Sequence, residues 1–151
     1  MQYIQEAKEE PDDAGCVFCS IPGAEDDRVL TRGELAYVVL NKFPYNPGHL
    51  LIVPLRHVGE LEDVTADENA ELQALLQRSI GVLRRTSEPH GFNVGLNLGR
   101  IAGAGIPGHL HWHVVPRWSG DTNYMPVVGE TRVLPELLVE TYRRLKPGFD
   151  A

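Results

Sequence analysis

The sequence contains 151 residues, a length at which a single hydrophobic core is expected and two domains would be cramped. Its hydrophobic fraction of 42% and charged fraction of 23% are typical of a globular protein, and no apolar run approaches the roughly 20 residues that a membrane-spanning helix needs. The net charge of -7 argues against non-specific binding to nucleic acid, so we expect neither nucleic acid nor a membrane as a partner, and an anionic ligand would need a local pocket of donors.

The N-terminal segment, residues 1–15, is acidic and has neither the basic start nor the apolar stretch of a secretory signal. We interpret it as a flexible arm ahead of a single domain over residues 16–151. Both cysteines fall in one motif, Cys16-Val17-Phe18-Cys19. Without an export signal, the pair indicates a reducing compartment, the cytoplasm, and a metal clip rather than a disulfide.

The next segments are typical of short strands. Gly33 separates the stretches 28–31 and 34–40, and the second is rich in residues that favour strands, so the two predict a hairpin. Two prolines, Pro44 and Pro47, punctuate a loop over 41–48, and a strand is expected over 49–54.

A long amphipathic helix is predicted over residues 66–86. Thr65 and Glu68 have the spacing of a capping box, and leucines then recur at helical intervals. After a turn, alternating apolar residues predict a strand over 92–98, followed by a glycine-rich loop over 99–108, a strand over 109–116 and a final helix over 135–145. The order β-β-β-α-β-β-α predicts an α+β fold: an antiparallel five-stranded sheet with one long helix and a C-terminal helix.

Three of the six histidines lie within five residues, in the strand His109-Leu110-His111-Trp112-His113. Because side chains alternate between the faces of a strand, the three imidazoles are expected on one face and the apolar residues on the other. Packing alone does not explain this pattern. Two functional interpretations remain: a nucleophilic site, or a catalytic metal site with three histidine ligands.

This strand resembles the signature of the histidine triad superfamily, in which histidines alternate with hydrophobic residues. The resemblance extends back through Asn41, the strand that begins at Gly48-His49, and Asn97, and it covers residues from Cys16 to about Asp121. It is closest to the branch of the fragile histidine triad hydrolases and the diadenosine tetraphosphate phosphorylases, where Pro-Arg follows the triad as Pro116-Arg117 does here.

A neutral imidazole is a good nucleophile near pH 7, because its ordinary pKa is about 6.5. The resemblance implies that His111 attacks an α-phosphate and forms a covalent nucleotidyl-histidine, which water or phosphate then resolves. It also implies that the carbonyl of His109 fixes the tautomer of His111. His113, if protonated, would donate to a nonbridging or leaving oxygen.

The resemblance assigns substrate contacts to Asn41, His49 and Asn97. Gly103 and Gly105 have no side chain, so backbone N–H groups in their loop could approach phosphate closely. Turn formation, strand-end bonding or core packing would explain the same residues. The sequence departs from the family at Gly105-Ile106, where many relatives carry a polar pair, and Arg100 or Arg117 would then have to supply the missing contacts.

A Cys-x-x-Cys motif is half of a tetrahedral zinc site. By resemblance to bacterial histidine triad proteins that begin in this way, His57 and His109 are expected to complete the set with Cys16 and Cys19. Such a zinc would be structural, and no organic cofactor is expected. A free thiol pair in the core and a redox dithiol are the alternatives.

We therefore expect an enzyme that hydrolyses or phosphorolyses dinucleoside polyphosphates such as diadenosine tetraphosphate. The segment 118–125 resembles the tail of the phosphorylase-like branch and favours long dinucleotide substrates. The alternatives are a purine nucleoside phosphoramidase, a nucleotide sensor of low turnover, and a metal-dependent hydrolase. The resemblance also implies a homodimer whose sheets join across a two-fold axis.

Overall fold

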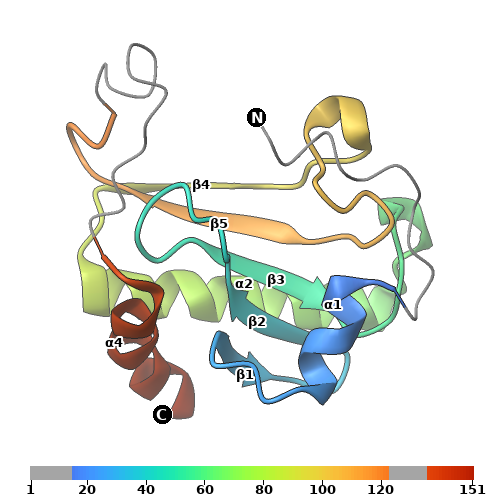
Figure 1. Cartoon of the computed structure of the whole chain (residues 1–151), viewed down its shortest axis with the longest axis horizontal. Coiled ribbons are helices and arrows are strands. Elements are labelled where there is room, and N and C mark those ends of the chain that lie inside the picture. Colours follow the sequence, from blue (N-terminus) through green and yellow to red (C-terminus); the bar gives the residue numbers. More distant parts are fainter. Residues whose placement is uncertain (1–14, 123–135) are drawn as a thin grey trace.

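The computed structural model describes residues 15–122 and 136–151. Within them, five strands form one antiparallel sheet in the order β1-β2-β3-β5-β4 (Figure 1). The strands are β1 (Val29–Arg32), β2 (Ala36–Leu40), β3 (Leu50–Pro54), β4 (Gly91–Gly95) and β5 (Trp112–Arg117). The predicted α+β fold with a five-stranded antiparallel sheet is therefore confirmed.

The long helix α2 (Ala66–Ser87) begins where the sequence predicts. Thr65 accepts a hydrogen bond from the backbone N–H of Glu68, and the Glu68 carboxylate accepts from the backbone N–H of Thr65, which completes the capping box. The helix runs along one face of the sheet, and the C-terminal helix α4 (Leu138–Asp150) packs against both α2 and β1 (Figure 1).

The sheet has an apolar core on each face. On the α2 side, alternate strand residues such as Val38, Ile52 and Val114 pack against helix residues such as Leu72 and Leu83. The opposite face packs against the one-turn helix α1 (Val17–Ser20) and the 3-10 helix η2 (Ile21–Gly23). This second core contains Cys16, Phe18, Ile21, Tyr37, Val39, Leu51 and Val53.

The pairing of β3 with β5 places the histidines. Leu51 lies opposite His113 and Ile52 opposite Trp112, although the two strands are distant in sequence. His113 therefore lies on the same face of the sheet as Leu51, whereas Trp112 lies on the other face and packs into the α2-side core. The predicted separation of imidazoles from the apolar residues Trp112 and Val114 agrees with this register.

Several predicted boundaries were wrong. The histidine strand starts at Trp112 rather than 109, because its pairing with β3 begins at Ile52 and the N–H of Leu110 donates to the carbonyl of Val58 instead. Strand β4 ends at Gly95, where its last partner in β5 is His113, rather than at 98. Helix α4 extends to Asp150, with Phe149 buried in the core, rather than ending at 145.

Two short 3-10 helices complete the described elements: η3 (Leu61–Asp63) and η4 (Arg100–Ala102), the second within the glycine-rich loop. The predicted arm over 1–15 lies outside the described residues except for Gly15, as does the predicted start of the final helix at Pro135. Among the helices of residues 15–122 and 136–151, none has both the length and the apolar character needed to cross a membrane.

Candidate active site

His111 is held by the main chain just before β5. Its Nδ1 lies 2.8 Å from the carbonyl oxygen of His109, and because a carbonyl only accepts, Nδ1 carries the proton. The Nε2 atom therefore presents a lone pair. His111 is 8% exposed, and its ring packs against Phe18. Burial lowers the pKa of His111, although the carbonyl bond opposes this effect, so the ring is neutral near pH 7.

His113 contacts His49 from the neighbouring strand end. The His49 Nε2 and His113 Nδ1 atoms are 2.9 Å apart, and the His111 and His113 ring centroids are 5.0 Å apart. His49 is 1% exposed. Burial, together with repulsion from the neighbouring imidazoles, lowers the pKa of His49 to about 3 and that of His113 to about 4.

The proton positions in this pair follow from one backbone donor. The N–H of Tyr45 donates to His49 Nδ1 over 3.1 Å, so the His49 proton must sit on Nε2. His49 Nε2–H then donates to His113 Nδ1, and the neutral His113 ring must carry its proton on Nε2. That buried Nε2 has no hydrogen-bond partner within the described part of the chain.

This arrangement changes the expectation that a protonated His113 is the donor. Protonation of His113 would place N–H on both of its nitrogens, so Nδ1–H would face His49 Nε2–H. His49 could avoid that clash only by moving its own proton to Nδ1, where it would meet the Tyr45 N–H. With Nδ1 accepting from His49, the neutral His113 ring offers a single N–H at Nε2.

A second cluster lies beside His109. The ligand atoms of Cys16, Cys19, His57 and His109 all lie within 4.8 Å of one another. The Cys16 Sγ to His109 Nδ1 distance is 3.3 Å, as is the Cys19 Sγ to His57 Nδ1 distance. These separations match the roughly 3.3–3.8 Å between neighbouring ligands of a tetrahedral zinc with two sulfurs and two nitrogens. These four residues are close enough to bind a metal.

The tautomer of His109 also fits a metal ligand. Its Nε2 lies 2.9 Å from the carbonyl oxygen of Pro54, so Nε2 carries the proton and Nδ1 presents a lone pair toward the cysteines. His109 is 0% exposed. A catalytic metal held by all three triad histidines does not agree with this geometry, because His109 faces the cysteines and His113 Nδ1 faces His49.

The other predicted site residues mainly form hydrogen bonds that hold nearby loops and rings in place. Asn41 accepts from the N–H of Phe43 through Oδ1, and its Nδ2 lies 3.4 Å from the His49 ring nitrogens. Asn97 donates through Nδ2 to the carbonyl of Gly103, which has a φ of 92° and closes η4. Gly105 is partly exposed in the same loop.

The predicted replacement of phosphate contacts by Arg117 is not supported. The guanidinium of Arg117 donates to both carboxylate oxygens of Asp121 at 2.6 and 2.8 Å, and also to Asn93 and Thr122. Arg100 is exposed in η4.

Sequence reasoning missed three contributors to the histidine cluster. Tyr45 supplies the backbone donor to His49, and its ring is stacked with that of His113 at a centroid distance of 6.2 Å. Phe18, inside the cysteine motif, contacts His111, and Asn46 anchors the loop that carries Tyr45. No periodic pattern marks a residue that acts through its backbone N–H.

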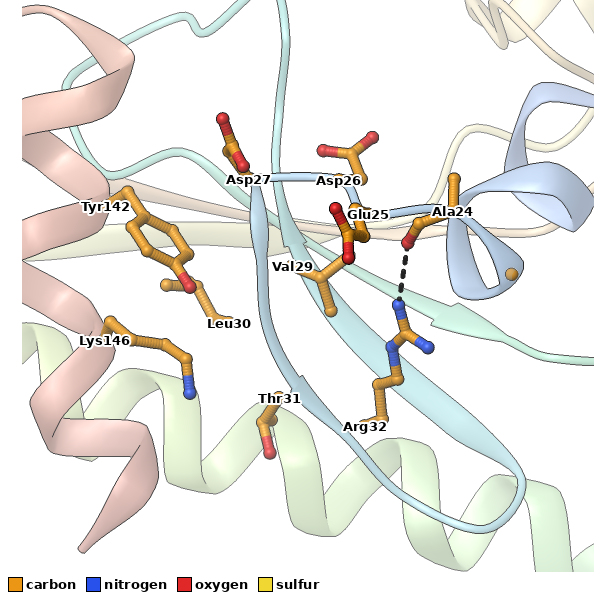
Figure 2. Close-up of a pocket in the computed structure, with 11 residues that line it drawn as sticks. Ala24, Glu25, Asp26, Asp27, Val29, Leu30, Thr31, Arg32, Tyr142 and Lys146 are labelled. Carbon is orange, nitrogen blue, oxygen red and sulfur yellow. Dashed lines mark hydrogen bonds between the residues drawn. The ribbon is translucent and has the colours of Figure 1, made fainter.

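A groove elsewhere on the surface holds none of the predicted site residues. It is lined by the edge strand β1, residues 23–27 and α4, and Figure 2 shows Tyr142 and Lys146 of α4 facing Leu30 and Thr31 of β1. Asp26, one of its charged residues, forms an ion pair with the neighbouring Arg28. The chemistry-bearing histidines are therefore separate from this groove.

The family profile described as HIT domain matches residues 23–120, which include β1–β5 and all three triad histidines. The chain belongs to the HIT domain family. It is 50% identical over 152 residues to a protein of Mycobacterium tuberculosis named AP-4-A phosphorylase, and the match covers 96% of this chain and 78% of the relative.

Two solved HIT structures share the fold. A zinc-bound histidine triad family protein from Mycobacterium smegmatis has a TM-score of 0.75 and 27% identity, with 92% of this chain and 96% of that chain covered. A hypothetical histidine triad nucleotide-binding protein from Sulfolobus tokodaii has a TM-score of 0.71 and 27% identity, with 89% of each chain covered.

Proposed function

We propose that this HIT domain protein cleaves dinucleoside polyphosphates, such as diadenosine tetraphosphate, at an α-phosphate through a covalent nucleotidyl-histidine. The observation that carries the proposal is the pair of oriented rings: His111 presents a lone pair at Nε2, and His113 presents a proton at Nε2. The 50% identity to a protein named AP-4-A phosphorylase supports this substrate class.

In the first step, the His111 Nε2 lone pair forms a bond to the α-phosphorus, and the bond from that phosphorus to the bridging oxygen breaks. With diadenosine tetraphosphate, ATP leaves and AMP stays on the ring. The imidazole gains positive character, which the His109 carbonyl stabilises at Nδ1–H over 2.8 Å. Covalent catalysis thus divides one difficult displacement into two.

His113 supports this step as a neutral hydrogen-bond donor. Negative charge builds on the leaving and nonbridging oxygens, and the buried Nε2–H is the group available to meet it. The lone pair at Nδ1 already accepts from His49, so donation needs no rearrangement. The ring is oriented before substrate binds.

The same proton arrangement favours phosphate over water in the second step. Water must lose a proton as it attacks. Neutral His113 cannot accept that proton, because its Nε2 already carries one and its Nδ1 lone pair accepts from His49. Inorganic phosphate already carries an anionic oxygen and needs no base. Its attack breaks the P–N bond, releases ADP and returns the electron pair to His111, so we favour phosphorolysis.

The glycine-rich loop and its neighbours are our candidates for binding the phosphate chain. Gly103 and Gly105 leave room for close approach to backbone N–H groups, and Asn97 braces the loop at the Gly103 carbonyl. Asn41 and His49 support the residues that contact substrate rather than binding it themselves, since His49 is buried beneath Tyr45 and His113.

We further propose that the cluster of Cys16, Cys19, His57 and His109 binds zinc. The two thiolates and two imidazoles suit zinc, four protein ligands complete a tetrahedron, and a zinc-bound relative has the same fold. Its role would be structural. Metal-binding thiols are also consistent with a reducing compartment such as the cytoplasm.

A homodimer is our proposal for the assembly. Strand β4 forms one edge of the sheet, with Asn93 and Val94 exposed on it, so it can pair with a second copy. Light scattering coupled to size-exclusion chromatography distinguishes a dimer from a monomer.

The decisive experiment incubates the purified protein with diadenosine tetraphosphate, with and without inorganic phosphate, and identifies the products. ADP and ATP formed only with phosphate establish phosphorolysis, and AMP and ATP without it establish hydrolysis. Binding without turnover indicates a sensor. Faster cleavage of an adenosine phosphoramidate than of the dinucleotide would indicate a phosphoramidase, and trapping AMP on His111 would confirm the covalent step.

A further inference from the structure

Asp121 is the centre of a polar network next to the histidine cluster. Its carboxylate accepts from the Arg117 guanidinium at 2.6 and 2.8 Å, from the Trp118 N–H at 3.2 Å and from Asn46 Nδ2 at 2.7 Å. These donors lower the pKa of Asp121 far below its usual range, so the carboxylate stays ionised. The side chain is 14% exposed.

Asn46 connects this network to the loop before β3. Its Nδ2 also donates to the carbonyl of Pro116 in β5 over 3.0 Å, and its own carbonyl accepts from the N–H of His49. The loop is therefore fixed to β5 through one side-chain amide. Tyr45, the residue whose N–H donates to His49 Nδ1, directly precedes this anchor.

The two histidines behind Tyr45 form a pair with two possible proton arrangements. In one, both rings carry the proton on Nε2, and His113 offers N–H to the substrate. In the other, both carry it on Nδ1, and His113 offers a lone pair that would repel phosphate oxygens. The Tyr45 N–H excludes the second arrangement because it would face a proton on His49 Nδ1.

We propose that Asn46 and Asp121 are positioning residues that select the active proton arrangement of His49 and His113. They act by holding the Tyr45 N–H against His49 Nδ1 through the 2.7 Å contact between Asn46 and Asp121. Both residues act through the loop and so are positioning rather than catalytic residues. The kinetic consequence rests on the proposed function, whereas the proton arrangement itself can be measured without substrate.

The variants are Asn46→Ala, Asp121→Ala and the double replacement. Release of the loop admits the inactive arrangement, so kcat for diadenosine tetraphosphate should fall about 10- to 100-fold with little change in KM. Because both residues act through one loop, the double variant should be no worse than the more impaired single variant. Glu136→Ala is the matched control, since it breaks the Arg144 ion pair on α4.

The second readout is the tautomer of each ring, measured by long-range proton–nitrogen NMR on labelled protein. In the wild type, both rings should be protonated at Nε2, whereas the Asn46 and Asp121 variants should show mixtures. Should Asp121→Ala fail to fold, Asn46→Ala carries the test alone, because it removes the same 2.7 Å contact from the other side.

Wild-type tautomers in the folded variants, or an equal loss of kcat in Glu136→Ala, would overturn the positioning role. If the wild type does not cleave the dinucleotide, the proposed function is wrong, but the spectra still decide this inference. Mixed tautomers confined to the Asn46 and Asp121 variants would support it.

Discussion

His49 Nε2 and His113 Nδ1 lie 2.9 Å apart, so the buried ring sets which nitrogen of its neighbour carries a proton. Through this contact, the Tyr45 N–H in the loop before β3 determines the tautomer of a histidine on β5.

Replacing His111 with Ala or Gly should abolish nucleotidyl transfer. The Nε2 lone pair forms the bond to phosphorus, so its loss should reduce kcat by about 10⁴-fold or more. No AMP adduct should be trapped in that variant. The exposed His90 provides a matched control, and His90→Ala should retain wild-type turnover. Full activity in His111→Ala would refute the mechanism.

Replacing His49 with Phe should lower kcat by roughly 10²-fold while KM changes little. Phe fills the buried site but cannot donate to His113, whose Nε2–H is then no longer fixed. Steady-state kinetics with diadenosine tetraphosphate measure both constants. A rise in KM at constant kcat would instead show that His49 contributes to substrate binding.

The wild type should lose more stability than His49→Phe between pH 7 and pH 5. The folded-state pKa of His49 is about 3, against an ordinary 6.5, so in this window the unfolded chain binds a proton that the folded chain excludes. The stability that the folded protein owes to a neutral His49 is therefore complete above pH 6.5 and is lost as the pH falls toward 3. Urea denaturation of both proteins at several pH values measures the difference, and parallel curves would contradict the assignment.

Removing metal should destabilise the fold without removing the nucleophile. If zinc occupies the cluster at a hundredfold excess over its Kd, chelation should lower the free energy of unfolding by about 3 kcal/mol. Elemental analysis of the purified protein should find one zinc per chain, and none in Cys19→Ser. An equal unfolding midpoint with and without chelator would exclude a structural metal.

The sequence was most informative where local chemistry decides structure. The capping box at Thr65 and Glu68 and the leucine spacing predicted α2 to within one residue, since helix ends depend on nearby residues. The four proposed metal ligands were also named from the motif and the family resemblance, and the structure brings them together.

The sequence was least informative where distant backbone groups decide. Strand β5 begins at Trp112 because of its pairing with β3, and no pattern around His109 encodes that limit. The tautomer of His113 depends on the N–H of Tyr45, 68 residues earlier, and the identity of a residue does not show where its backbone N–H donates. The expectation of a protonated donor stays a prediction, and the structure favours the neutral ring.

His109 contributes three separate groups: Nδ1 toward the cysteines, Nε2 to Pro54, and its carbonyl to His111. Mutagenesis at this position therefore cannot report on a single role. A loss of activity in His109→Ala would combine metal loss, disruption of the β3 end and backbone movement beside the nucleophile. Anyone who ranks the triad by alanine scanning would overrate its first member, and backbone-ester or metal-exchange experiments would separate the three effects.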